Sequence, residues 1–226
     1  ADAADALLAS AERRAAAEEF SGVSLESISK FCLDSESASK NIENMIGATQ
    51  IPLGYAGPVT IKGDFADGRF VVPLATTEGA LVASISRGMS VTDASGGVRT
   101  KVFKDKMTRA PVFKVRDLAH SAEVMEWVDA NMDLIHEEIS KTTSHGKLSE
   151  IEKYPDGRNL FLRFVYSTGD AMGMNMATIA TESACRLIEQ NTGAQMVSVS
   201  GNMCSDKKPA AINIVRGRGK TVVAEA

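Results

Sequence analysis

Two adjacent lysines, Lys207 and Lys208, stand beside an aspartate, Asp206, in the segment GNMCSDKKP at residues 201–209. The glycine, the proline and the small neighbours favour a tight connection between two domains. A lysine held in a cleft of this kind could stabilise an anion or a developing oxyanion. The alternative is that both ammonium groups are solvated, as lysines in loops usually are. Since adjacent side chains diverge, the two lysines would serve different purposes.

A carboxyl group, Glu78, follows two threonines in the stretch TTEG at residues 76–79 and precedes an apolar run with helical spacing. A carboxylate in the first turn of a helix stabilises the helix dipole by about 0.3–1 kcal/mol. The alternative is a carboxylic acid in an apolar cleft that donates a proton near neutral pH. Gly79 would let another chain or a ligand approach closely. The residues alone leave both interpretations open.

The segment STGDAMGMNM at residues 167–176 connects an expected strand to an expected helix through Gly169. The first amide groups of such a helix could hold a phosphate. The segment is not the GxGxxG pattern of the common dinucleotide fold, and its methionines could equally be core residues. Two arginines, Arg87 and Arg109, could pair with phosphate or carboxylate groups, although exposed arginines usually have no such role.

The composition is that of an ordinary globular chain of 226 residues, 44% of them hydrophobic, which is enough to bury one large or two modest domains. Its 25 basic and 29 acidic residues give a formal charge of -4, which provides no general field for nucleic acid and argues against that partner. No apolar run approaches the roughly 20 residues that cross a bilayer, so we expect no membrane segment here and a cytoplasmic location.

The cysteines and histidines show no metal-binding pattern. The three cysteines lie far apart and form no CxxC pair, which argues against a disulfide framework and a zinc site. The three histidines have no metal spacing with one another or with cysteine. We therefore predict reduced thiols and no metal. The residues concerned are Cys32, Cys185, Cys204, His120, His136 and His145.

The first hundred residues predict helices before a sheet. Residues 1–20 are rich in alanine with interspersed charges, which favours a helix, and residues 24–33 carry apolar side chains at helical spacing. Residues 59–75 alternate as a pair of strands around a turn that contains glycine. The two threonines that follow would cap a helix that ends near Gly96.

From residue 111 the expected elements follow an informative order: strand, helix, strand, strand, helix, strand. This order is typical of a ferredoxin-like split unit. The elements are expected at residues 111–117, 121–142, 147–154, 159–167, 171–191 and 195–200. The unit, at residues 110–199, would be inserted into a larger domain, because the strand-like run at residues 212–226 resumes a sheet outside it. The predicted fold class is therefore α+β, with a helical segment at the N-terminus.

Six segments together resemble the 3-hydroxy-3-methylglutaryl-coenzyme A reductase family, in the same order and spacing, from about residue 20 to the last residue. The methionine in GMN, where other members have alanine, resembles the biosynthetic class. The sequence HGK at residues 145–147 resembles the corresponding segment of archaeal members. The six segments are IENMIG, PLGYAGP, TTEG, DKMTRAP, GDAMGMN and SGNMCSDKKPAAIN.

The resemblance implies a two-step reduction. The coenzyme A thioester takes a hydride, the hemithioacetal breaks down to an aldehyde and a free thiol, and a second hydride gives mevalonate, with two NADPH consumed. The ferredoxin-like domain would hold NADPH, although Ser144-His145-Gly146 stands where many animal enzymes have a Ser-Arg-Phe cluster for the 2′-phosphate. The implied cofactor residues are Ser144, His145, Asp170, Met172, Gly173, Met174 and Asn175.

The resemblance also implies the catalytic and substrate-binding residues. Lys207 would stabilise the thioester oxygen during hydride attack, and Glu78 would protonate the aldehyde oxygen. Lys208 and Arg109 suit the free carboxylate of the glutaryl group, and Arg87 would lie nearer the coenzyme A phosphates. The other implied substrate-site positions are Ser200, Asn202 and Asp206.

The domains implied by the resemblance are a helical N-terminal segment at residues 1–45, part of a large substrate domain at residues 46–109 and 200–226, and a small NADP-binding domain at residues 110–199. Family members form dimers or higher even oligomers with the active site at the subunit interface. Residues 43–47 match the part that approaches the partner's site.

The family extends beyond the part that matches this chain, and the extension carries a catalytic aspartate and a histidine that protonates the departing thiolate. Neither residue has a counterpart in these 226 residues. Two hypotheses follow. The chain is part of an active reductase, or it is a non-catalytic fragment that keeps NADP binding or dimer pairing. A ferredoxin-like module for another ligand would require the six matches to be accidental.

Overall fold

The structure is a computed structural model that describes residues 3–33, 38, 42–204, 210–217 and 219–226. Contacts divide the chain into two compact units. Unit 1 comprises Ala1–Thr60 and Gly68–Gly97, and unit 2 comprises Ile61–Asp67 and Val98–Ala226. Each unit is described by itself. The predicted domains remain predictions, and the compact units divide the chain differently, because residues 98–109 and 200–226 fall in the same unit as residues 110–199.

Unit 1 begins with helix α1 (Ala3–Ser21), as predicted, followed by a single 3-10 turn, η1 (Glu26–Ile28). The second helix predicted at residues 24–33 is wrong, because its backbone groups bond to other segments. Glu18 Oε1 accepts a hydrogen bond from Leu25 N at 2.5 Å, and Ile28 O accepts one from Ala48 N at 3.0 Å. These bonds hold the segment in an irregular path against its neighbours.

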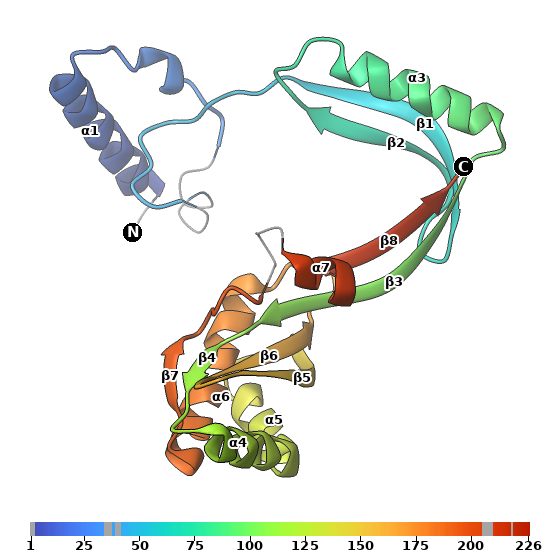
Figure 1. The fold of residues 1–226 in the computed structure, drawn as a ribbon. Coiled ribbons are helices and arrows are strands. Elements are labelled where there is room, and N and C mark those ends of the chain that lie inside the picture. The colour runs from blue at the N-terminus through green and yellow to red at the C-terminus, as the bar shows by residue number, and fades with distance from the viewer. Residues whose placement is uncertain (1–2, 34–37, 39–41, 205–209, 218) are drawn as a thin grey trace. The chain divides into compact units, whose positions relative to one another are not determined.

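The rest of unit 1 is a strand pair with one helix along it. Strands β1 (Leu53–Gly63) and β2 (Asp67–Ala75) pair, and helix α3 (Leu81–Ala94) packs on them (Figure 1). Asp93 in the last turn of α3 fixes this packing, since it accepts hydrogen bonds from the backbone and the hydroxyl of Thr60 and pairs with Arg69.

Unit 2 is built on a sheet whose strands are mostly antiparallel. Strand β6 lies between β5 on one side and the successive strands β3 and β4 on the other, β7 pairs with β4, and β8 pairs with β3. At the start of β3, residues 98–100 pair in parallel with residues 61–63 of β1. The strands are β3 (Val98–Arg109), β4 (Val112–Lys114), β5 (Lys147–Asp156), β6 (Asn159–Ser167), β7 (Gln195–Ser198) and β8 (Gly219–Glu225).

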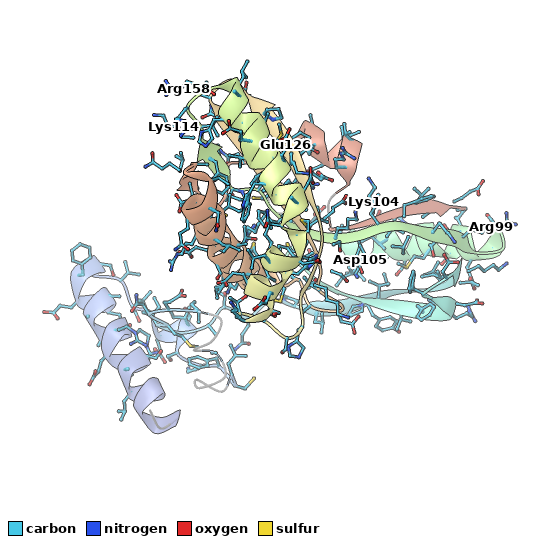
Figure 2. The ribbon with its side chains drawn as sticks, turned by 90° about the horizontal axis from the view of Figure 1, so that it is seen from below. Arg99, Lys104, Asp105, Lys114, Glu126 and Arg158 are labelled. Atoms are coloured by element: carbon cyan, nitrogen blue, oxygen red, sulfur yellow. The ribbon has the colours of Figure 1, made fainter. Side chains whose placement is uncertain are left out.

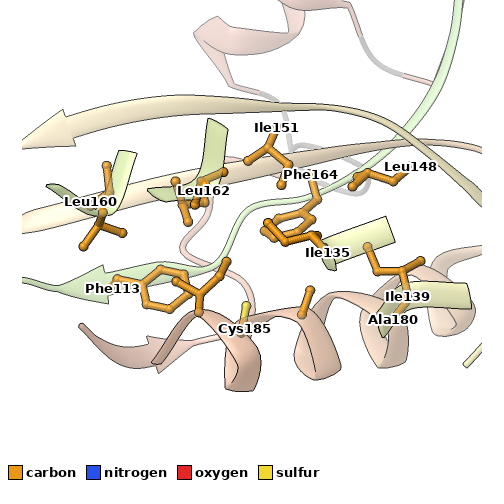
Figure 3. Packing of buried hydrophobic residues seen from close by; sticks show 14 of the residues in the cluster. Phe113, Ile135, Ile139, Leu148, Ile151, Leu160, Leu162, Phe164, Ala180 and Cys185 are labelled. Atoms are coloured by element: carbon orange, nitrogen blue, oxygen red, sulfur yellow. The ribbon is translucent and has the colours of Figure 1, made fainter. Parts of the chain in front are cut away.

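The predicted order of strand, helix, strand, strand, helix, strand is present in unit 2. Helices α4 (Leu118–Ala130) and α5 (Met132–Ser140) lie between β4 and β5, and α6 (Met174–Thr192) lies between β6 and β7. Alternate residues of β6 supply the centre of the core, where they meet Ile135 of α5 and Ala180 of α6 (Figure 3). These β6 residues are Leu160, Leu162, Phe164 and Tyr166, all fully buried. Burial of such side chains supplies most of the stability of a domain this size.

Two sequence predictions for unit 2 are wrong, and one strand was missed. The single helix predicted at residues 121–142 is two helices, because Asn131 at their junction has a non-helical φ of -120° and ψ of 27°. The first part of the run at residues 212–226 is a short helix, α7 (Ala211–Arg216), and only β8 is a strand. Strand β3 was not predicted at all, although its exposure alternates along most of its length.

Candidate functional site

The GDAMGMN segment forms the turn from β6 into α6. Gly173 precedes the first helical residue with a left-handed φ of 70°. A Cβ at this position would lie 2.6 Å from Thr168 Cγ2, so the turn requires glycine for its backbone and for its space. Thr168 Oγ1 donates to Ala171 O at 2.6 Å and closes the turn. The first amide groups of α6 are thereby presented at the end of the turn, where helix geometry leaves them available to an anion.

A pocket of about 290 Å³ lies beside this turn and is lined by residues 105–107, 168–172 and 219–220. Asp170 and Met172 are exposed at its wall. The opposite wall comes from neighbouring strands, where Lys106 pairs with Glu150 at 2.5 Å and Lys220 pairs with Asp105 at 2.6 Å. Figure 2 shows Asp105 and the neighbouring Lys104 on β3.

The charges around this pocket are mixed. Two ammonium groups lie with three carboxylates, counting Asp170, so the walls do not form a uniformly positive hole for a bare phosphate. An aspartate instead suits the hydroxyl and amide donors of a nucleotide. The lysines are about half exposed in their ion pairs, which makes those pairs weak enough to exchange partners when an anionic ligand arrives.

The connection between α5 and β5 lies against the same turn. Gly146 is buried, and a side chain at this position would collide with Met176 in the first turn of α6. The exposed residues Ser144 and His145 immediately before it are joined by a hydrogen bond of 2.9 Å between Oγ and Nδ1. The structure thus brings the predicted cofactor residues of the two segments together at one end of α6.

Arg109, a predicted substrate-binding residue, is bound to the same helix. Its Nε donates to Thr178 Oγ1 at 2.6 Å, and its Nη2 donates to Met174 O at 3.4 Å. The guanidinium group therefore lies beside the first turn of α6 and is already ordered by protein contacts. A further ligand would meet an arginine of fixed orientation.

The segment before the predicted lysine pair is attached to the end of β3. Gly201 N donates to Ala110 O at 2.7 Å, and the Thr108 hydroxyl donates to Cys204 O. The thiol of Cys204 accepts a hydrogen bond from Ala110 N at 3.1 Å and lies 3.1 Å from Ser200 Oγ. Asn202 has a left-handed φ of 66°. Asp206, Lys207 and Lys208 follow directly and lie outside the described residues.

Glu78 and Arg87 belong to unit 1, and both are exposed there. Glu78 precedes α3, but the expected threonine cap is wrong. Thr76 Oγ1 accepts a hydrogen bond at 2.9 Å from Glu78 N, whereas α3 begins after Ala80, whose φ is 64°, without a side-chain cap. The apolar cleft around Glu78 is also not formed within unit 1, because the neighbouring residues 77–80 are exposed.

Comparison with known proteins identifies the family. The sequence model of the hydroxymethylglutaryl-coenzyme A reductase family matches residues 9–226. The chain belongs to the hydroxymethylglutaryl-coenzyme A reductase family. The reductase of Halobacterium salinarum is 51% identical over 225 residues, which are 99% of this chain and 56% of that protein. The reductase of Methanothermobacter thermautotrophicus is 51% identical over 215 residues, or 94% of this chain and 54% of that protein.

A solved structure supports the fold. The class II 3-hydroxy-3-methylglutaryl-CoA reductase from Streptococcus pneumoniae bound to NADPH has a TM-score of 0.64 and 17% identity, covering 94% of this chain and 56% of that one. At this identity the likeness concerns the fold alone. This reductase chain spans about half the length of the relatives it matches.

The described residues show neither a metal-binding cluster nor a membrane-spanning helix. No group of three or more His, Cys, Asp or Glu side chains in the described part is arranged to hold a metal ion. Among the described helices, none is long and apolar enough to cross a bilayer. The pocket residues Lys106 and Lys220 were not predicted from the sequence, and the alternating pattern of β3 was the signal that would have placed Lys106 on a strand.

Proposed function

We propose that this chain supplies the cofactor domain and part of the substrate domain of a reductase that converts 3-hydroxy-3-methylglutaryl-coenzyme A to mevalonate and coenzyme A with two NADPH. This is a step of isoprenoid biosynthesis. The observation that carries the proposal is the family match over residues 9–226. It is supported by the structure at the start of α6, where Gly146 and Arg109 both lie against residues in the first turn of the helix, beside the GDAMGMN turn.

In this proposal the domains are those predicted from the sequence, namely residues 1–45, residues 46–109 with 200–226, and residues 110–199. The enzyme works in the cytoplasm as a homodimer or a higher even oligomer. These assignments follow the family resemblance, which includes archaeal relatives that are about half identical to this chain.

The cofactor residues fit part of a nicotinamide dinucleotide. NADPH, when bound, supplies the hydrides for both reductions. The amide groups at the start of α6 suit its phosphates, and Asp170 suits hydroxyl or amide donors. Ser144 and His145 would contact the 2′-phosphate side. The remaining contacts would come from the turn itself, at Met172, Gly173, Met174 and Asn175.

The substrate residues would act on the thioester and its product. Lys207 would stabilise the oxygen that gains negative charge, and Glu78 would give a proton to the aldehyde oxygen. Because Glu78 is exposed within unit 1, its surroundings as an acid would have to come from the assembled enzyme. Lys208 and Arg109 would bind the glutaryl carboxylate and Arg87 the coenzyme A phosphates. Ser200, Asn202 and Asp206 would complete the substrate site.

Cofactor binding is tested by calorimetry on the 226-residue chain. Asp170→Ala should raise the Kd for NADPH by about tenfold, because it removes a hydrogen-bond acceptor worth roughly 1.5 kcal/mol. The control is Asp156→Ala, which removes an exposed aspartate at the far end of β5. An unaltered Kd in Asp170→Ala would reject this cofactor site.

Catalysis is tested in the complete polypeptide that contains these residues, with NADPH oxidation as the readout. Lys207→Met should abolish thioester reduction and leave NADPH binding intact. Glu78→Gln should slow the reduction of mevaldehyde, and full activity on that aldehyde would remove Glu78 from the role of acid. NADPH oxidation that does not depend on the thioester substrate, in the wild type and in every variant, would count against the proposed reductase activity.

The alternative, a non-catalytic fragment, is distinguished by the same assays on the 226-residue chain. Its mass is 24.0 kDa, which intact-mass analysis and gel filtration can verify. NADPH binding without turnover, from this pure species and also in the complete polypeptide, would favour the alternative. Turnover that requires a second polypeptide would favour a reductase assembled from two parts.

A further inference from the structure

The face of the β5–β6 hairpin that points away from the helices carries a buried ion pair. Leu160, Leu162 and Phe164 point into the core, so Arg163 points the other way. Its partner in the ladder is Glu152 on β5. Arg163 Nη1 lies 2.9 Å from Glu152 Oε2, and the two side chains are only 3% and 11% exposed.

Arg163 also binds the segment that precedes the predicted lysine pair. Its Nε donates to Met203 O at 3.1 Å. Gly201 lies against the same face, since a Cβ there would meet Phe161 at 2.9 Å. The chain from Gly201 to Met203 is therefore attached to β6 by a charged hydrogen bond and by close packing.

A second arginine attaches the segment that follows the lysine pair. Arg216, the last residue of α7, donates from Nε to the hydroxyl of Tyr154 at 3.2 Å and lies 3.9 Å from Glu152 Oε1. Lys104 on β3, visible in Figure 2, donates to Arg216 O at 2.8 Å. The last residue of α7 is thereby bound to unit 2 strands through both its side chain and its carbonyl group.

Glu152 is the group that these contacts share. One of its oxygens accepts from Arg163 and, at 2.7 Å, from the hydroxyl of Tyr154, and the other faces Arg216. Burial raises the pKa of Glu152, but the hydrogen bonds from Tyr154 and Arg163 and the two positive charges outweigh it, so the pKa lies below its ordinary value. The carboxylate is thus charged at neutral pH and pairs with Arg163, which in turn holds Met203 O of the first flank, and with Arg216 of the second flank.

A buried ion pair is an expensive way to hold a fold together, because desolvation of both charges offsets much of their attraction. A hydrophobic pair would fill the same space at similar stability. The directional contacts of one carboxylate, through Arg163 to the first flank and directly to Arg216 of the second, provide something that apolar packing does not, a fixed distance and orientation between the two flanks.

We propose that Glu152 is a positioning residue, which through Arg163 and Arg216 fixes the two flanks, residues 201–204 and 211–216, of the segment that carries Lys207 and Lys208. This role depends on the function proposed above, in which Lys207 acts on the thioester. Glu152 itself touches neither the substrate nor the cofactor in this scheme.

The test compares Glu152→Gln and Arg216→Ala with a matched control in the complete polypeptide. Arg216 is half exposed, so its variant folds even if the buried substitution does not. The control is Asp129→Asn, which removes from helix α4 the exposed partner of Lys153, a residue of β5 next to Glu152. Steady-state kinetics with the thioester and with NADPH, calorimetry with NADPH, and hydrogen exchange of residues 199–217 are measured for each.

We expect kcat for thioester reduction to fall at least tenfold in both variants, with the Kd for NADPH unchanged within twofold. Amides of the two flanks should exchange at least tenfold faster, and the control should match the wild type. Normal kcat with normal exchange would overturn the positioning role and leave the proposed reductase intact. Faster exchange with normal kcat would also overturn it.

Failure of the proposed function is recognised separately. If the wild-type protein binds NADPH but never reduces the thioester, the reductase proposal fails and the catalytic purpose of Glu152 fails with it. The exchange measurement then still decides whether Glu152 holds the two flanks, because it needs neither substrate nor turnover.

Discussion

The hydroxyl groups of Tyr166 on β6 and Thr181 on α6 lie 2.7 Å apart and share a hydrogen bond inside the core of unit 2. Both side chains are fully buried. Burial raises the pKa of the Tyr166 hydroxyl, so this group stays neutral. The bond ties the sheet to α6 two turns after the GDAMGMN turn.

Thr181→Val should destabilise the chain by about 1–3 kcal/mol, because it leaves the Tyr166 hydroxyl buried without its partner. Urea unfolding followed by circular dichroism measures the loss. The double variant with Tyr166→Phe removes both polar groups and should be no less stable than Thr181→Val alone. Simple addition of the two single losses would show that the hydroxyl groups do not depend on each other.

Gly173→Ala tests the turn that presents the first amides of α6. Its φ of 70° disfavours any Cβ, and the new methyl would also press on Thr168 at 2.6 Å. The matched control is Gly193→Ala at the other end of α6, where φ is also 70° but nothing lies within 4 Å. The control should lose about 1 kcal/mol in urea unfolding from backbone strain alone.

Gly173→Ala should lose more than this control in urea unfolding, and it should also weaken NADPH binding, which the control should not. Equal losses of stability in the two variants would mean that the turn yields to the methyl group without strain. Equal NADPH affinity would separate the geometry of the turn from cofactor binding.

The sequence predicted the order of strands and helices in unit 2 because its signals are local. The apolar alternation of β6 and the glycine turns of the hairpin are readable within ten residues. The break at Asn131 was missed because the apolar period continues across it, and only the backbone angles of this one residue depart from the helix. Residues 211–216 were mistaken for a strand because β-branched residues favour strands only on average, and local context overrides them.

The candidate site was predictable only where one segment carries it. The GDAMGMN turn was singled out from its glycine and its place before a helix, and the family resemblance supplied its predicted cofactor role. Lys106 and Lys220 reach the same pocket from strands that pair across 115 residues of sequence, as the Lys220 to Asp105 bond shows, and no local pattern reports such pairing. The role of Glu152 was missed for the same reason, since its partners Arg163 and Arg216 come from separate elements.

The three thiols should differ sharply in their reaction with a disulfide reagent. Cys32 is exposed, whereas Cys185 and Cys204 are buried. Burial raises the pKa of the Cys185 thiol well above its ordinary value, so little reactive thiolate forms. We expect one fast equivalent in the native chain, lost in Cys32→Ser, and three equivalents in urea. Two fast equivalents in the native chain would show that the segment around Cys204 opens readily.

The ion pair of Glu152 predicts a particular pH dependence of stability. The folded-state pKa of Glu152 lies below its ordinary value of 4.5, since the hydrogen bonds and charges of its partners outweigh its burial. A carboxyl group of this kind stabilises the folded state above the unfolded pKa, and this contribution is lost as the pH falls through the folded pKa. Glu152→Gln should therefore destabilise the folded state at pH 7 and do so progressively less below pH 4.5.

Urea unfolding of wild type and Glu152→Gln at several pH values between 7 and roughly 3 measures this difference. The curves should converge on the acid side, because the protonated glutamate and the glutamine are then both neutral. Asp129→Asn, which removes the exposed α4 partner of Lys153 on the same strand, should give a small difference at every pH. A difference in unfolding free energy between wild type and Glu152→Gln that stays constant down to the lowest pH would contradict this prediction. The destabilisation would then come from altered packing and not from the loss of the charge of Glu152.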